Sequence, residues 1–240
     1  MAAEAGTGSP EEVPGAEKRF LRYAFFKVAR EWRAMEQDSK EVCMREFVEV
    51  LGKASQVELS FFSLVGIRGD VDFMILFDSA SLDDQQAIMA SALATKMGRY
   101  LETPYSYLAM TRPSRYLGSH RHPGQEGTTQ DRVPDSRFLF VYPFVKKREW
   151  YALPFGERQR MMAQHFMIGH NYPAIRIHTG YSYGLDDQEF VLAFEGDDPA
   201  EFLALVEELR GSEASKYTQL ETPIFTCRRV TPERMLSLLG

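Results

Sequence analysis

The stretch DVDFMILFDSASLDD (70–84) decides the fold, because its pattern returns as DDQEFVLAFEGDDPA at residues 186–200. Each copy is followed by a predicted helix with an aromatic residue at its end. Next comes the tetrapeptide LETP, at residues 101–104 and again at 220–223. In both copies the proline lies at the start of a predicted strand, where a missing N–H is tolerated. The same tetrapeptide at the same point of both series indicates an internal duplication.

The elements predicted around these two copies also match. Aromatic and β-branched runs predict strands, and apolar residues at helical spacing predict helices. The first half reads as strand 19–28, a helix capped by Ser39 and running to 54, strands 57–66 and 71–80, helix 81–100 and strand 103–110. The second half reads as strand 137–146, helix 154–169, strands 174–183 and 188–196, helix 198–211, strand 222–230 and a short helix from 232. Each half is therefore a β-α-β-β-α-β unit.

This order predicts an α+β fold of two tandem ferredoxin-like repeats. Their sheets are expected to pack face to face or to close into a barrel, a double-sheet protomer like a dimeric α/β barrel. The predicted parts are a flexible leader (1–17), an N-terminal repeat (18–111), a linker or loop (112–136) and a C-terminal repeat (137–240) that carries the binding site. A loop as long as 112–136 in a compact protein is usually functional or disordered.

The composition excludes several classes of protein. The chain has 240 residues, of which 44% are hydrophobic and 26% charged, as in an ordinary globular protein. No apolar run approaches the roughly 20 residues that span a bilayer, and no signal peptide is recognisable, so we expect a cytoplasmic protein without stable membrane insertion. A net charge of -6 argues against nucleic acid as a partner, and two cysteines imply no disulfide framework.

The C-terminal half holds the densest group of candidate binding residues. In strand 137–146, Tyr142, Phe144 and Lys146 share one face, because side chains alternate along a strand. Aromatic rings with a lysine suit a planar ligand that bears carboxylates. The alternative is an ordinary core strand with Lys146 emerging at its end. No P-loop, GxGxxG, GxSxG or HExxH motif is present, and the five-residue spacing of His165 and His170 does not favour a joint metal site.

The second half resembles the chlorite dismutase superfamily, and within it the haem-biosynthetic branch of coproheme decarboxylases in its actinobacterial form. Four segments carry the resemblance: YPFVKKREWYALP (142–154), ERQRMMAQHFMIGH (157–170), YSYGLDDQEFVLAFE (181–195) and LVEELRGSEASKYTQLETPIFTCRR (205–229). They cover most of the C-terminal repeat in the order of the family. The N-terminal half fits only through its duplicated pattern.

The resemblance implies a homopentamer that binds Fe-coproporphyrin III and converts it to haem b. Hydrogen peroxide is the oxidant, and two propionates leave as carbon dioxide after a tyrosyl radical forms. The implied roles are the proximal iron ligand (His165), a carboxylate that accepts its second N–H (Glu213), the redox-active tyrosine (Tyr142), a neighbouring basic residue (Lys146), a tryptophan beside the propionates (Trp150) and a propionate-binding arginine (Arg210).

The distal side of the porphyrin is less defined. The resemblance makes His120 in GSHRHPG the candidate base for peroxide activation, with His122 as its competitor. Counting back from the GLDD turn puts Ile177 where chlorite-degrading members have an arginine. Its neighbours Arg176 and His178 would then point the other way, although a slip of one residue would turn an arginine inward. Chlorite dismutation, a haem carrier without turnover and a fold with no porphyrin therefore stay open as alternatives.

Overall fold

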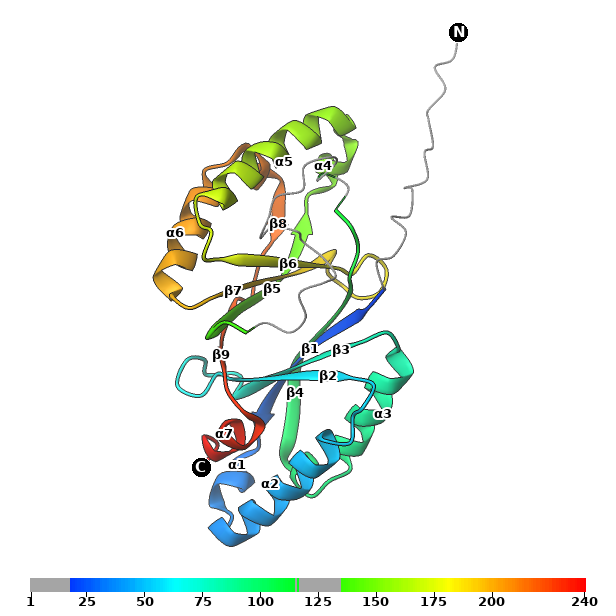
Figure 1. Cartoon of the computed structure of the whole chain (residues 1–240), viewed down its shortest axis with the longest axis vertical. Helices are drawn as coiled ribbons and strands as arrows, with labels where there is room; N and C mark the ends of the chain where they lie inside the picture. The colour runs from blue at the N-terminus through cyan, green and yellow to red at the C-terminus, as the bar shows by residue number, and fades with distance from the viewer. Residues whose placement is uncertain (1–17, 115, 117–134) are drawn as a thin grey trace.

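The computed structural model describes residues 18–114, 116 and 135–240, and two β-α-β-β-α-β repeats follow one another along the chain (Figure 1). The N-terminal repeat consists of β1 (Phe20–Val28), α1 (Arg30–Ala34), α2 (Gln37–Leu51), β2 (Glu58–Ser63), β3 (Phe73–Ser79), α3 (Leu82–Leu93), the 3-10 helix η1 (Met97–Tyr100) and β4 (Leu101–Met110). The predicted cap at Ser39 is wrong. Helix α2 begins at Gln37 after Glu36, so Ser39 lies inside its first turn.

The C-terminal repeat has the same order with a divided last strand. It consists of β5 (Phe138–Lys146), α4 (Arg148–Ala152), α5 (Phe155–His170), β6 (Arg176–Tyr181), β7 (Phe190–Gly196), α6 (Pro199–Arg210), the 3-10 helix η2 (Glu213–Tyr217), β8 (Thr218–Leu220), β9 (Phe225–Arg229) and α7 (Pro232–Ser237). The predicted strand 222–230 begins only at Phe225, after a cis peptide bond between Thr222 and Pro223.

The two sheets join into a closed barrel. Each repeat forms an antiparallel sheet, β4-β1-β3-β2 in the first and β6-β7-β5-β9 in the second. Strand β2 pairs with β9, and β4 meets β6 through Met110 and Tyr181, so both edges of each sheet are covered. Closure removes the exposed edges that an open sheet would present. The predicted α+β fold of two ferredoxin-like repeats is confirmed, and the barrel form of the protomer is the one observed.

Alternation along the strands separates the barrel core from the cores beneath the helices. One face of every sheet fills the barrel, where Phe25, Met74, Val141 and Phe225 are among the residues with no exposed surface. The opposite faces pack beneath helices. Helices α2 and α3 cover the N-terminal sheet, and α5 and α6 cover the C-terminal sheet at the other end of the molecule (Figure 1). The barrel core takes residues from both repeats, so it does not show where one repeat ends and the other begins. The predicted domain boundaries remain a prediction.

The C-terminal helix α7 packs on the N-terminal repeat. Met235 and Leu236 are buried in the core beneath α2, beside Phe47 and Leu51. Strand β9 leaves the C-terminal sheet beside β2 and delivers the chain end to the lower half of Figure 1. The sequence placed this helix in residues 137–240, and its packing partner was not predictable from its own residues.

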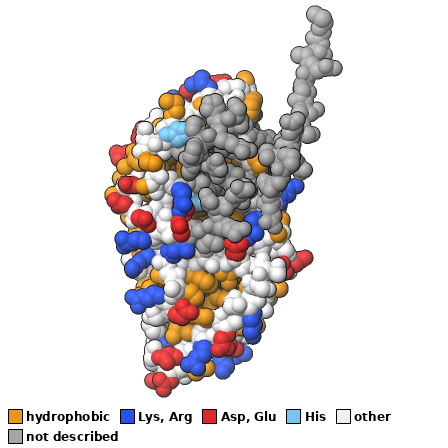
Figure 2. Space-filling view, in the orientation of Figure 1, with side chains coloured by type: hydrophobic (Ala, Val, Ile, Leu, Met, Phe, Trp, Pro, Cys, Tyr) orange, Lys and Arg blue, Asp and Glu red, His pale blue; other side chains and the backbone are white. Residues whose placement is uncertain are grey.

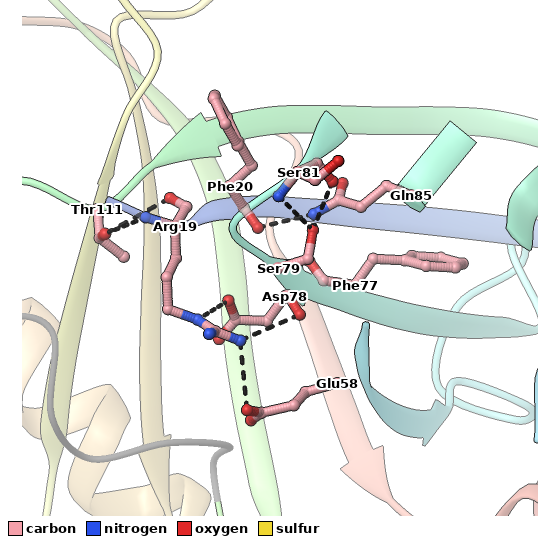
Figure 3. Close-up of polar contacts among 9 residues, drawn as sticks. All are labelled: Arg19, Phe20, Glu58, Phe77, Asp78, Ser79, Ser81, Gln85 and Thr111. Carbon is pink, nitrogen blue, oxygen red and sulfur yellow. Dashed lines mark hydrogen bonds and ion pairs between the residues drawn. The ribbon is translucent and has the colours of Figure 1, made fainter. Parts of the chain in front are cut away.

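One polar network ties the strands of the N-terminal sheet together (Figure 3). Arg19 donates from Nε to Asp78 at 2.6 Å and from Nη2 to Glu58 at 3.3 Å. Its backbone N–H donates to the hydroxyl of Thr111 at 3.0 Å. These contacts join β1 to β2, β3 and the residue after β4, so one arginine fixes four neighbouring segments at one end of the sheet.

The seam between β4 and β6 depends on a glycine. A Cβ added at Gly180 would lie 2.6 Å from Cβ of Ala109, an atom that cannot move without the strand. Overpacking of this kind costs about 1–3 kcal/mol, so Gly180→Ala should lower the free energy of unfolding by that amount in urea denaturation. Gly69→Ala is the matched control, since nothing lies within 4 Å of its added Cβ. Equal stability of the two variants would contradict this account of the seam.

The surface mixes charges of both signs. Figure 2 shows lysine, arginine and acidic side chains spread over one face, around a patch of hydrophobic side chains in its lower half. Among the helices of the described residues, none combines the length and apolar character needed to cross a membrane.

Candidate functional site

Strand β5 presents two of the predicted site residues toward the helices. Alternation puts Val141 inside the barrel and turns Tyr142, Phe144 and Lys146 outward. Pairing with β7 runs from Phe138 to Phe144 and sets Tyr142 opposite Leu192. The register with β8 shifts between Val145 and Lys146, and Nζ of Lys146 nevertheless lies 5.1 Å from the ring centroid of Phe144. The shared face predicted for the tyrosine and the lysine is therefore observed.

Tyr142 lies between the sheet and helix α6. Its ring stacks on that of Phe194, with the centroids 5.8 Å apart, and Leu205 and Leu209 of α6 belong to the same buried cluster. Burial raises the pKa of Tyr142, the negative charge of Glu221 raises it further, and the positive charge of Arg210 opposes them. The phenol is consequently protonated at neutral pH.

Lys146 is buried although it ends the strand. Only 9% of its surface is exposed. The alternative of a core strand whose final lysine emerges into solvent is therefore not what the structure shows. Its Nζ donates to the backbone oxygen of Ala214 at 3.0 Å and lies 4.7 Å from the ring centroid of Trp150 and 5.1 Å from that of Phe144. Burial lowers the pKa of Lys146 to about 8, against the opposing charges of Glu189 and Glu221.

Helix α4 turns the chain directly after Lys146 and buries Trp150. The indole is 3% exposed and packs with Met161 of α5 and Ala214 of η2. The Tyr217 ring lies 5.5 Å from it. Trp150 thus joins strand, helix and 3-10 helix around the lysine.

Helix α5 brings His165 to the same place. The Nδ1 atom of His165 is buried and has no hydrogen-bond partner among the described residues. Burial, and then the positive charge of Lys146, lowers the pKa of His165 to about 4, so the imidazole is neutral at physiological pH. A neutral imidazole is the form that ligates a metal.

The predicted hydrogen bond between His165 and Glu213 is not formed. Glu213 instead accepts from Nη2 of Arg160 at 3.0 Å, on the outer side of α5. The residue does lie at the start of η2, the segment that also provides the Ala214 oxygen to Lys146. Its role toward the imidazole stays a prediction.

Arg210 lies at the end of helix α6, beside Glu221. It is the last residue of α6, and its Nη1 lies 2.6 Å from Oε1 of Glu221, the glutamate of the second LETP. The charges of both residues act on the phenol of Tyr142, and that of Glu221 also acts on Lys146. Glu221 was not singled out from the sequence, although the tetrapeptide that revealed the duplication contains it.

Strand β6 turns one of its candidate residues toward Tyr142. Ile177 pairs with Phe194 and packs in the cluster of Tyr142, so its side chain is on the site's face. Arg176 and His178 point to the other face, where both contact the buried carboxylate of Glu195, at 2.7 Å and 3.1 Å. The slip that would turn an arginine inward does not occur. His120 and His122 lie outside the described residues.

A further match between the two repeats, not recognised in the sequence, shows where the site residues of the second repeat differ from the first. FKVAREWRA (26–34) and FVKKREWYA (144–152) align without a gap, and the same alignment matches the first residues of α2 and α5. Tyr142, Lys146 and His165 then fall on Ala24, Val28 and Phe47, which are all buried in the N-terminal core. Three apolar core positions of the first repeat are thus polar in the second, and this difference marks the site.

Comparison with known proteins agrees with this geometry. The profile of the family described as chlorite dismutase matches residues 27–230. The chain belongs to the chlorite dismutase family. It is similar to a coproheme decarboxylase from Mycolicibacterium smegmatis, with 30% identity over 224 residues, which cover 92% of this chain and 94% of that protein.

Solved structures of the family share the fold. The chlorite dismutase from Candidatus Nitrospira defluvii in complex with imidazole has a TM-score of 0.84 at 19% identity, covering 93% of this chain and 95% of that one. A mutant of the same protein has a TM-score of 0.83 at 20% identity, covering 91% and 94%. At these identities the likeness concerns the fold alone.

The residues present fit a metalloporphyrin that bears carboxylates. His165 provides a neutral imidazole with an unpartnered buried nitrogen, Lys146 and Arg210 provide positive charge, and Tyr142 and Trp150 provide rings. Within the described residues no three His, Cys, Asp or Glu side chains gather into a metal site. Each role of these residues remains a prediction.

Proposed function

We propose that this member of the chlorite dismutase family is a coproheme decarboxylase that uses hydrogen peroxide to convert Fe-coproporphyrin III to haem b. The observation that carries the proposal is the group of Tyr142, Lys146 and His165 between one face of the C-terminal sheet and its helices. The equivalent positions of the N-terminal repeat hold only apolar core residues. The relative named coproheme decarboxylase, 30% identical over 92% of this chain, supports it.

Each residue of the site has a proposed role in binding the substrate or in moving a proton. His165 holds the iron of the substrate, and Lys146 and Arg210 hold its carboxylates, for which a planar guanidinium has bidentate geometry. Trp150 packs beside Lys146 and limits access of water to it. The base that takes a proton from peroxide is proposed to be His120 or, failing that, His122.

Tyr142 passes the oxidising equivalent to the propionate. The phenol gives up one electron and its proton, and the phenoxyl radical then takes a hydrogen atom from the propionate carbon next to the ring. Loss of carbon dioxide and of a second electron leaves a vinyl group. Each propionate consumes one hydrogen peroxide and one proton and yields one carbon dioxide and two waters. The substrate's iron supplies the redox chemistry, and the protein supplies ligation and orientation.

Stepwise addition of peroxide to the Fe-coproporphyrin III complex tests this proposal. Mass spectrometry of the porphyrin should record two successive losses, each of carbon dioxide and two hydrogens, and end at the mass of haem b. A porphyrin that keeps all four propionates while peroxide is consumed would contradict the function. The proposed pentamer and cytoplasmic location are tested separately, by light scattering and by fractionation of cells.

Two alternatives are tested in the same preparation. The hypothesis of chlorite dismutation is based on Arg176, and this residue contacts Glu195 on the face away from Ile177. Sustained oxygen evolution from chlorite would nevertheless favour it. A haem carrier without turnover draws on the apolar Ile177, and tight haem binding without reaction toward either oxidant would favour that reading.

Binding of the porphyrin should weaken above pH 8. Lys146 loses its proton as pH rises through about 8, whereas the propionates stay ionised, so the ion pair between them is lost. We expect the dissociation constant, measured by Soret titration without peroxide, to be constant from pH 6.5 to 7.5 and to rise toward pH 9.5. Lys146→Arg, which keeps its charge, should give a flat profile. A wild-type profile that is equally flat would contradict the role of Lys146.

A further inference from the structure

Arg210 is already occupied by a carboxylate of its own chain. Its Nη1 lies 2.6 Å from Oε1 of Glu221, a short ion pair between the end of helix α6 and the residue after β8. The two side chains are 55% and 27% exposed, so the pair lies at the rim of the site and can open without uncovering the core. A planar guanidinium that already donates to one carboxylate has fewer free N–H donors for a second carboxylate.

Glu221 lies beside the site residues, directly after strand β8. The residue before it, Leu220, pairs with Val145 of β5, and Ile224, three residues further along, packs in the cluster of Tyr142. The charge of Glu221 acts on the phenol of Tyr142 and on Lys146. Glu221 is therefore placed among the groups that would meet the porphyrin's edge.

Lys146 differs from Arg210 in this respect. Its Nζ donates to the neutral backbone oxygen of Ala214 and belongs to none of the ion pairs among the described residues. An incoming carboxylate can add to Lys146 without displacing an anion. At Arg210 the same carboxylate must replace Glu221 or share the guanidinium with it.

We propose that Glu221 is a specificity-determining residue that competes with a porphyrin propionate for Arg210, so that substrate binding is an exchange of one carboxylate for another. The inference rests on the proposed function, since it assumes an iron porphyrin with propionates as the ligand. When the ligand is absent, Glu221 holds the guanidinium in place. When a propionate arrives, Glu221 turns to solvent, which its position at the rim allows.

This exchange predicts that removal of the Glu221 charge strengthens binding. Glu221→Gln keeps the size of the side chain but leaves Arg210 without its anion. The dissociation constant of Fe-coproporphyrin III, measured by Soret titration without peroxide, should fall on the order of fivefold, the upper range for a partly exposed ion pair. The tetramethyl ester of the same iron porphyrin carries no carboxylate, and its affinity should not change. Glu221→Asp keeps the charge and should not tighten binding as Glu221→Gln does.

A cycle with Arg210→Ala isolates the pair. Arg210→Ala alone should weaken binding of the free acid by about tenfold or more, as expected for loss of a hydrogen bond to a charged group. Glu221→Gln added to Arg210→Ala should then tighten binding much less than Glu221→Gln does alone, because the contested guanidinium is gone and only the charge of Glu221 near Lys146 is removed. Unchanged or weaker binding in the single Glu221→Gln variant would overturn the inference, as would equal tightening for acid and ester.

The result is distinguishable from failure of the proposed function. If the wild-type complex binds Fe-coproporphyrin III but peroxide leaves its mass unchanged, decarboxylation fails while the exchange at Arg210 is still measured. If decarboxylation proceeds and Glu221→Gln does not tighten binding, the exchange alone is wrong. A wild-type protein with no Soret change on titration overturns both.

Discussion

Tyr142→Phe is expected to abolish decarboxylation while leaving porphyrin binding within about twofold of wild type. The substitution removes one hydroxyl group and keeps the ring that stacks on Phe194 and packs against α6. A phenyl ring cannot form a phenoxyl radical by loss of an electron and a proton, so the oxidising equivalent does not reach the propionates. Peroxide should still react with the complex, and the porphyrin mass should stay at four propionates.

The measurement pairs mass spectrometry with Soret titration of the same sample. Tyr100→Phe is a suitable control, because Tyr100 lies in the N-terminal repeat, where its ring is 5.8 Å from that of Trp32. This control should decarboxylate at the wild-type rate. Vinyl products formed by Tyr142→Phe at more than a few per cent of the wild-type rate would show that the electron takes another path, and the role of Tyr142 would be abandoned.

His165→Ala is expected to give the largest loss of binding. The imidazole is the only neutral nitrogen ligand that the described part of the site presents, since Lys146 is largely protonated at pH 7 and donates to Ala214. Without it the iron has no protein ligand on that side, and the Soret spectrum should become that of a weakly held, unligated porphyrin. The fold should survive, because His165 makes no hydrogen bond from its buried Nδ1 that the variant would break.

Added imidazole offers a rescue that a structural role would not permit. Removing the side chain leaves room for the free base, so millimolar imidazole should restore a ligated Soret spectrum in His165→Ala. His170→Ala, at the exposed end of the same helix, is the control and should bind as the wild type does. A wild-type spectrum in His165→Ala without imidazole would exclude this histidine as the ligand.

Much of the fold could be predicted from the sequence because the duplicated elements repeat their patterns. The β-α-β-β-α-β order of the main elements was read correctly in both halves. The two short helices α1 and α4 were missed because single helical turns carry no periodic signal, although the repeated REW triplet at 30–32 and 148–150 could have revealed them. The division of the last strand was missed because the cis bond before Pro223 has no distinct sequence pattern.

The sequence predicted which residues form the site, and that membership stays a prediction; the contacts of these residues could not be predicted. Alternation along β5 placed Tyr142 beside Lys146, and resemblance to the family named His165, Trp150 and Arg210. What each side chain binds could not be read from spacing. Glu213 contacts Arg160 rather than the imidazole, and Arg210 contacts Glu221, over distances along the chain that no local pattern spans.

The sequence by itself determined that this protein is two copies of one β-α-β-β-α-β unit and that Tyr142 and Lys146 share one face of a strand. Those properties are local, since strand alternation and helical spacing depend on near neighbours. The tertiary structure decided that the sheets close into a barrel, that Ile177 rather than Arg176 is on the site's face, and that Glu221 occupies Arg210. Those depend on register and packing between distant segments, which are set only when the apolar faces of both repeats are buried together.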